Sequence, residues 1–462
     1  MLRRCFVWLF PRSNLLFKLC CVMSAAVLGA SITNYDADGA ERADSTKMTT
    51  ATNQMTMDAV IAEVLEHNAE MNFYSAEIAA AKGDARATAT WSNPEFSTTV
   101  GDKRVTGGGL AAEGVAWSVS VRQTFEWPGR IPLRKAIANQ QIQLAELGFA
   151  QFKAALAART RSAAFGLFAA QQKSAAAREV ADRFHALRAV LVQRDPAGIT
   201  PELELRIIEA TEIMMLRKAS EASIAQQAAM LELNQLRGQP WQQALTVAPV
   251  DLTFTTAPEP GVLLAAAKAN NFEIRMRQVE LEQQGFKVEL AKNDRYPSFA
   301  VAPYFSQERA GERERQVGIG ISMPLPLWNR NEGNVESAMA RQKQAETSMY
   351  VTQRAIERQV VEKALMYQTK LTEMAKWRPE SIAEFRKAAA LADRHYRLGA
   401  VPIATYVELQ KQYLEAVEVL LETRREALEA AQQVEVLTGL EINAARTSRS
   451  DKGEASGKSP KP

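Results

Sequence analysis

The sequence is poor in the residues that most often build catalytic or metal-binding sites. Among its 462 residues there are only three cysteines and three histidines. These residues are Cys5, Cys20, Cys21, His67, His185 and His395. The cysteines all lie near the N-terminus, and no two histidines are four residues apart, which is the spacing that places two ligands on one helix face. The sequence therefore predicts no metal site, no cofactor and no catalytic residues, and hence not an enzyme.

Glycine and proline are also scarce, at 23 and 18 residues. Long stretches of Ala, Glu, Gln, Lys, Arg and Leu take their place, a composition typical of long helices. The formal net charge of +3 comes from the first thirty residues, which contain four basic residues and no acidic ones. The rest of the chain is close to neutral, so the sequence gives no indication of a nucleic-acid partner.

The N-terminal segment has the pattern of an export signal. A basic stretch precedes an apolar run from Leu19 to Ala30, which at about 12 residues is shorter than the roughly 20 that a membrane-spanning helix needs. Small residues follow where a peptidase could cut, so residues 1–30 are predicted to be a signal peptide. The alternative is a buried or interfacial helix. Residues 31–55, rich in Asp, Thr, Ser and Ala, are predicted to be a linker.

Similar passages recur about two hundred residues apart. The matching pairs are 66–71 with 269–274, 93–96 with 296–299, 117–121 with 317–321, and 234–238 with 435–439. This pattern predicts a two-fold internal repeat over residues 56–239 and 261–440. A proline-rich linker, 240–260, joins the repeats, and a disordered tail, 441–462, follows them.

Each repeat is expected to contain a helix, a β-hairpin and a helical hairpin. Residues Arg130–Arg194 contain no proline after Pro132 in the first turn and would form a helix on the order of 95 Å long. Its apolar residues recur every seven positions, which requires a second helix along its length: Ile142, Phe149, Leu156, Ala163, Ala170, Ala177, Phe184 and Leu191. The remaining helices are expected at 57–89, 201–237, 262–294, 333–397 and 403–438, with turns at 195–200 and 398–402.

Four segments alternate between apolar and small or polar residues. One strand is expected to begin after Pro94 and to end before a loop at 105–114, and the others are expected at 115–127, 297–307 and 315–327. This period of two fits a half-buried sheet in a soluble protein and also the wall of a transmembrane barrel. Four strands cannot close a barrel, and open strand edges are not tolerated in lipid. If the strands cross a membrane, several chains must share one barrel, and three copies would supply twelve strands.

The doubled helix–β-hairpin–helix–helix order resembles the TolC-like outer-membrane efflux proteins over roughly residues 56–440. The run Arg397-Leu398-Gly399-Ala400 and the Leu-x-Gly sequence that closes each half contribute to this resemblance. The run from Phe125 to Arg130 is further similar to the branch that serves heavy-metal resistance–nodulation–division (RND) pumps of the cobalt-zinc-cadmium type.

The resemblance implies a mainly α-helical homotrimer with a β-barrel part. Its twelve-stranded barrel would lie in outer-membrane lipid, and helical hairpins would form an α-barrel tunnel through the periplasm. Such a duct conducts its cargo, here heavy-metal cations, passively from a periplasmic adaptor protein and an inner-membrane RND transporter. Loops 101–114 and 306–314 would face the exterior, and turns 195–200 and 398–402 the periplasm.

The same resemblance suggests two groups of functional residues. Glu204 and Glu408 are predicted to form acidic rings that narrow the tunnel, because charged side chains that symmetry arranges in a ring set ion preference. The alternative is that both are ordinary solvated glutamates. The turn residues Gly198, Arg397, Leu398 and Gly399 are predicted to dock the adaptor. For the glycines, the alternative is the usual cap at a helix C-terminus.

Other readings stay open at this level. A general multidrug or type I secretion exit duct would have the same architecture. A periplasmic coiled-coil adaptor or scaffold is a different class of protein, but it normally carries one helical hairpin flanked by β-rich domains, whereas this sequence predicts two hairpins.

Overall fold

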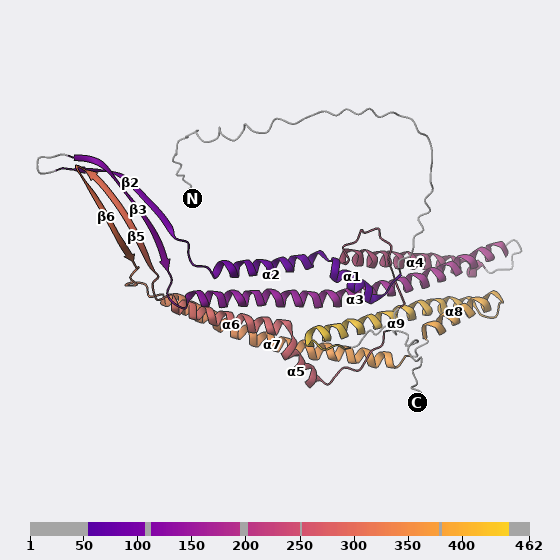
Figure 1. Ribbon diagram of the computed structural model, residues 1–462. Helices are drawn as coiled ribbons and strands as arrows, with labels where there is room; N and C mark the ends of the chain where they lie inside the picture. Colours follow the sequence, from indigo (N-terminus) through magenta and orange to yellow (C-terminus); the bar gives the residue numbers. More distant parts are fainter. Residues whose placement is uncertain (1–53, 107–111, 195–201, 250–251, 378–380, 443–462) are drawn as a thin grey trace, which may run out of the picture. The chain divides into compact units, whose positions relative to one another are not determined.

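The computed structural model describes residues 54–106, 112–194, 202–249, 252–377 and 381–442. Several predicted features lie outside these residues: the signal peptide, most of the linker that follows it, Gly198 and nearly all of the C-terminal tail. Within the described ranges the chain is mainly helical and carries one four-stranded sheet (Figure 1).

The helices fall on either side of the inter-repeat linker. Those before it are α1 (Met57–His67), α2 (Ala69–Thr88), α3 (Arg130–Arg194) and α4 (Glu202–Leu236). Those after it are α5 (Pro260–Asn270), α6 (Phe272–Asn293), α7 (Glu332–Ala375), α8 (Ser381–Arg397) and α9 (Ile403–Thr438). Helix α3 has the predicted bounds, and α4 and α9 pack against it, as its heptad pattern requires.

The strands form one antiparallel sheet in the order β2-β3-β5-β6. Their bounds are β2 (Glu95–Val105), β3 (Ala112–Phe125), β5 (Phe299–Ala310) and β6 (Glu312–Ser322). The central pairing of β3 with β5 joins the two halves of the chain. Strands β2 and β6 are the edges of the sheet, and each has one hydrogen-bonded neighbour in it.

The predicted loops 101–114 and 306–314 are wrong over most of their length. Strand β2 continues to Val105 and β3 begins at Ala112. Strands β5 and β6 are separated by Gly311 alone, whose φ of 85° lies in the left-handed region that glycine adopts without strain. Charged side chains made the second segment look like a loop, although they keep the two-residue period of a strand.

Three predicted helices are also divided. Helices 57–89 and 262–294 break at Asn68 and Asn271, each of which caps the helix that follows it. Asparagine does this because its side-chain oxygen accepts a hydrogen bond from a free backbone N–H of the first turn. The predicted helix 333–397 divides into α7 and α8. The sequence between them contains Pro379, and proline disfavours a helix interior because it lacks a backbone N–H.

A second, two-stranded sheet lies within the segments predicted to be linkers. Strand β1 (Gln54–Met55) pairs in parallel with β4 (Thr246–Val247). Leu245 and Val247 are buried beside it, so the inter-repeat linker packs against the helices. The sequence prediction missed this pairing because two-residue strands leave no periodic pattern.

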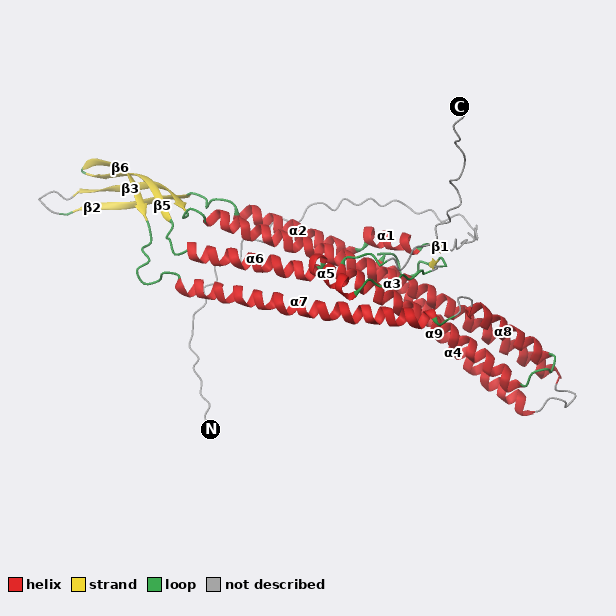
Figure 2. Cartoon of the chain, turned by 90° about the horizontal axis from the view of Figure 1, so that it is seen from below, coloured by secondary structure: helices red, strands yellow, loops and turns green. Residues whose placement is uncertain are grey.

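Four helices continue directly from the sheet. Neighbour contacts place them in the order α2-α3-α6-α7, which repeats the strand order β2-β3-β5-β6 (Figure 2). This part of the helical layer has few fully buried side chains; in α2 only Ala81 is buried. Along the described helices, none has a stretch long and apolar enough to cross a membrane.

The main hydrophobic core lies where α1, α3, α4, α5, α7 and α9 meet. Helix α9 supplies the longest set of buried residues, including Tyr406, Val417 and Leu428. A buried ion pair also lies in this region: the Arg237 guanidinium, 2% exposed, donates to both carboxylate oxygens of Glu63 over 2.9 Å. Burial alone would raise the pKa of Glu63, but the hydrogen bonds and charge of Arg237, with help from Gln239, hold it below its ordinary value.

Replacing Arg237 with methionine should destabilise the fold by about 3–5 kcal/mol, because it leaves Glu63 as a partly buried charge without its partner. The measurement is the thermal unfolding midpoint of the purified protein by circular dichroism. The matched control is Arg217→Met, since Arg217 forms a surface pair with Glu221 and its loss should cost no more than about 1 kcal/mol.

The stability of the wild type and that of the Arg237→Met variant should also respond oppositely to acid. A lowered pKa means that Glu63 stabilises the wild type above pH of about 4.5, and that this stabilisation is lost as pH falls through the folded-state pKa. In the Arg237→Met variant, protonation would instead relieve the unpaired charge. An equal loss of stability in both proteins on acidification would contradict this account.

Candidate functional site

The four-stranded sheet has two chemically different faces. Paired residues of the register place one set of large apolar side chains on a single face: Phe96, Val100, Val119, Val121, Phe299, Phe305, Val317, Ile319 and Ile321. The opposite face carries small and polar residues, among them Ser118, Ser120, Gly318 and Gly320. A side chain at Gly318 would collide with the Tyr304 ring at 2.7 Å, so that glycine makes room for the ring.

The apolar face is largely uncovered by the chain itself. Val317, Ile319 and Ile321 on the edge strand are 71–78% exposed. An apolar sheet face of this kind needs another apolar environment, either lipid or a partner. The small and polar face can instead line a space that holds water.

The segment from Phe125 to Arg130, which carries the heavy-metal branch resemblance, forms the junction between sheet and helices. The Trp127 ring stacks on Tyr296 with centroids 5.0 Å apart. Arg130 donates to the Tyr296 carbonyl over 2.8 Å and pairs with Asp294 over 2.8 Å. These residues tie β3 and α3 of the first half to α6 and β5 of the second.

Each half of the chain contains a buried asparagine that links the start of one helix to the end of another. Asn68 accepts from the Glu70 N–H over 2.9 Å and donates to the Leu236 carbonyl over 3.0 Å. Asn271 caps α6 and donates to the Leu437 carbonyl, also over 3.0 Å. In both halves, one side chain therefore caps one helix and satisfies a carbonyl at the end of another.

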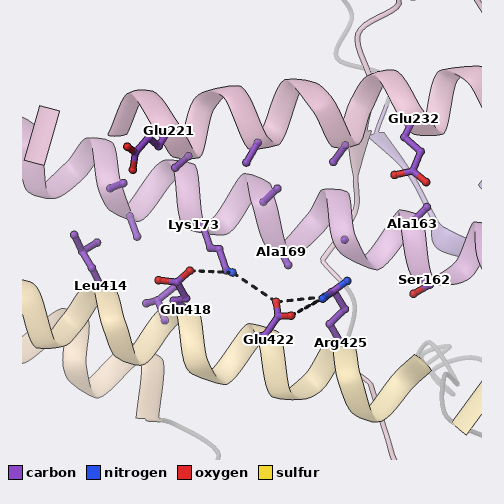
Figure 3. A pocket seen from close by; sticks show the side chains of 18 of the residues that line it. Ser162, Ala163, Ala169, Lys173, Glu221, Glu232, Leu414, Glu418, Glu422 and Arg425 are labelled. Atoms are coloured by element: carbon purple, nitrogen blue, oxygen red, sulfur yellow. Dashed lines mark hydrogen bonds and ion pairs between the residues drawn. The ribbon is translucent and has the colours of Figure 1, made fainter. Parts of the chain in front are cut away.

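A groove of about 700 Å³ lies between α3, α4 and α9 (Figure 3). Alanines of α3 and α4 line much of it, and charged residues of α9 stand along one side. Lys173 of α3 lies 3.6 Å from Glu418 and 3.8 Å from Glu422, and Arg425 contacts Glu422 and Glu429. The ion pairs connect the first helical hairpin to the second, and the Ser162 hydroxyl of α3 adds a hydrogen bond of 3.0 Å to Glu429 of α9.

The turn between α8 and α9, at residues 398–402, is the second helical tip. With the last residue of α8, it contains three of the predicted docking residues. Helix α8 ends in a Schellman motif: the Gly399 N–H donates to Tyr396 and the Ala400 N–H donates to His395, both over 2.9 Å. Gly399 has a φ of 72° and open space around it. Leu398 is 73% exposed, whereas Arg397 pairs with Asp393 over 3.0 Å.

The two predicted constriction residues lie in different surroundings. Glu204, in the first turn of α4, is half-buried and accepts a hydrogen bond of 3.5 Å from the Tyr396 hydroxyl of α8. Glu408 of α9 is exposed and accepts from Gln412 of the same helix over 2.9 Å. Within one chain the structure does not bring the two carboxylates together.

An aromatic cluster beside the tip was missed by the sequence analysis. Tyr396 stacks on the fully buried Tyr406 with centroids 5.3 Å apart, and Phe184 of α3 packs against Tyr406. Burial, together with the Glu204 carboxylate, raises the pKa of Tyr396 to about 12. Tyr406 donates to Asp393 over 3.4 Å. The available signal was the pair of tyrosines on either side of the Gly399 turn.

His185 pairs with an acidic residue. Its Nδ1 lies 2.8 Å from Glu212, and Arg188 donates to the other Glu212 oxygen over 3.1 Å. Burial alone would raise the pKa of Glu212, but the bonds from His185 and Arg188 lower it. Across the described ranges no group of three His, Cys, Asp or Glu side chains is arranged to hold a metal ion.

Sequence comparisons confirm the resemblance to efflux proteins. The family model described as outer membrane efflux protein matches residues 263–440. The cobalt-zinc-cadmium resistance protein CzcC of Cupriavidus metallidurans is 25% identical over 301 residues, which cover 64% of this chain and 69% of that protein.

Solved structures with a similar fold include proteins described as channels. The Campylobacter jejuni CmeC outer membrane channel has a TM-score of 0.70 at 14% identity, over 92% of this chain and 95% of that one. CusC has a TM-score of 0.66 at 14% identity, over 84% and 92%. At these identities the likeness establishes the fold alone.

Proposed function

We infer from these likenesses that the chain is an outer membrane efflux protein, and we propose that it is the passive exit duct of a tripartite pump. Three copies would form a twelve-stranded barrel in the outer membrane and a helical tunnel in the periplasm. A periplasmic adaptor and an inner-membrane RND transporter would deliver the cargo to the tunnel.

The observation that carries this proposal is the sheet with two open edges and an exposed apolar face. Strands β2 and β6 have backbone groups free to pair with another copy, and lipid tolerates no unpaired strand edge. Helices α2 and α7 lie at the two ends of the helical row in the same way. A ring of copies would pair β6 with the next β2 and α7 with the next α2.

The two-fold internal repeat is supported by the matched asparagine sites. Asn68 and Asn271 make equivalent bonds to the ends of α4 and α9. The glycines that follow, Gly238 and Gly439, have φ values of 65° and 67°. With the similar hairpins and the similar order of elements, these contacts favour an origin by duplication and a tunnel wall of six similar units in the trimer.

Heavy-metal cations are the proposed cargo. The support is the likeness to a cobalt-zinc-cadmium resistance protein and the junction segment from Phe125 to Arg130. The described residues hold no resident metal cluster, and a duct does not need one, because passage requires only weak contacts that let the ion leave.

Deletion of the gene should make cells sensitive to zinc, cobalt or cadmium, and the intact gene should restore growth. The measurement is growth across graded metal concentrations, alongside copper, silver, dyes and antibiotics. Sensitivity to dyes and drugs in place of metals would instead identify a general exit duct. A protein absent from outer-membrane fractions, or never found as a trimer, would overturn the duct proposal itself.

We propose that Glu204 and Glu408 ring the periplasmic end of the tunnel. Glu408→Ala should reduce cation-over-anion permeability about five-fold in single-channel recordings, because an elementary charge at about 4 Å contributes roughly 1 kcal/mol in water. Glu418→Ala is the matched control, since Glu418 lies on the same helix but pairs with Lys173 of α3. Equal permeability ratios in wild type and Glu408→Ala would rule out the ring at that residue.

We also propose that the tip residues dock the adaptor. Leu398→Ser should abolish cross-linking to the adaptor and metal tolerance while leaving the trimer intact, because Leu398 is exposed and contributes little to folding. Gly399→Trp should also abolish cross-linking, because it fills the open space beside the turn and strains a backbone whose φ is 72°. Val262→Ser, at an exposed position on α5, is the control. Unchanged cross-linking in both tip variants would show that the adaptor binds elsewhere.

A further inference from the structure

The hairpin end shared by β5 and β6 lies away from the helices (Figure 1). Its sequence is a run of alternating charges. Between Glu308 and Arg315 the chain holds three glutamates and three arginines. Because successive side chains of a strand point to opposite faces, the alternation separates the charges by sign. Glu308, Glu312 and Glu314 share the small and polar face, and Arg309, Arg313 and Arg315 share the apolar face.

On the small and polar face the like charges have a counterion within the chain. Glu308 and Glu314 lie directly opposite each other in the β5–β6 register. Lys103 of β2 contacts Glu308 and lies 3.2 Å from Glu314. Like charges in opposed positions destabilise a sheet, and Lys103 offsets that cost here.

On the apolar face the equivalent charges have no such partner. Arg309 and Arg313 also lie directly opposite each other, and both are exposed, as is Arg315. Among the described residues no carboxylate comes within ion-pair distance of these three arginines. The first hairpin differs at the same end of the sheet: there Arg104 is paired with Glu113 over 2.5 Å.

The unpaired arginines continue directly from the exposed apolar band of β6. Arg313 lies four residues, about 13 Å, beyond Val317 along the strand, and Arg315 lies between them. A molecule that complements this surface has an apolar part against Val317 and Ile319 and an anionic part against the arginines. Arginine suits phosphate in particular, because its planar guanidinium can donate two parallel hydrogen bonds.

We propose that Arg309, Arg313 and Arg315 form a binding site for the phosphate groups of an outer-leaflet glycolipid. The acyl chains of that lipid would lie along the apolar face of β5 and β6. This inference rests on the proposed function, since it needs the sheet to cross the outer membrane. In a trimer the site would occur three times, once on each second hairpin, and would alternate with the first hairpins, whose same face carries Asp102, Arg104 and Glu113.

The test compares lipid binding to purified, full-length protein in detergent. The probe is diphosphoryl lipid A, a bis-phosphorylated acylated disaccharide, and the readout is its dissociation constant with native mass spectrometry of the bound lipid. The variant R309Q/R313Q should bind at least about ten-fold more weakly, since it removes charge-assisted hydrogen bonds. It also removes a like-charge pair, so loss of folding is not expected.

The control variant is R104Q/E113Q, which removes a neutral pair from the same end of the sheet and should bind within about two-fold of wild type. Lipid A stripped of its phosphates should bind wild type as weakly as diphosphoryl lipid A binds R309Q/R313Q. Equal binding of diphosphoryl lipid A by wild type and R309Q/R313Q would overturn the proposal. Displacement of the lipid by equimolar inorganic phosphate would overturn the assignment to a lipid.

Fractionation of the wild type separates this inference from the proposed function. If the wild type is absent from the outer membrane, both fail. If it is present there as a trimer and the arginine substitutions leave lipid binding unchanged, only the lipid site fails.

Discussion

The backbone groups left free at the two edges of the sheet impose the constraint on which the rest of the structure depends. Strands β2 and β6 each have one neighbour in the sheet, and the apolar face between them is exposed. The helices that continue from the strands keep the same lateral order. The sheet therefore ends at β2 and β6, and the helical layer ends at α2 and α7, which are joined to those strands in the chain. In the proposed assembly, one chain would form a segment of a wall that further copies close.

Side-chain burial differs between the two ends of the helical part. Near the sheet, contacts between neighbouring helices bury few side chains, whereas the region around α9 holds a continuous apolar core. The two asparagine sites lie between these regions and let a helix end without leaving its carbonyls unpaired. The first half also contains the buried Glu63–Arg237 pair, a contact that is costly to break.

Charge is distributed along the chain in keeping with this architecture. At the far end of the sheet, strand alternation places glutamates on one face and arginines on the other. In the groove between α3 and α9, ion pairs cross from one helical hairpin to the other. At the second tip, Asp393 receives bonds from both Arg397 and Tyr406, so the turn is joined to the aromatic cluster behind it.

The sequence by itself determined the kind and order of the elements. Heptad spacing specified α3 and its partner helices, two-residue alternation specified the strands, and the recurrence of these patterns indicated two similar halves. The same local periods could not reveal where a helix breaks at Asn68 or Asn271, because those side chains bond to carbonyls 168 and 166 residues away. The tertiary structure also decided the pairing of β3 with β5, the tyrosine cluster behind Gly399 and the separation of the Glu–Arg run into two faces. Each of these depends on which distant segments pack together, whereas periodicity records only the conformation of a residue relative to its neighbours in the chain.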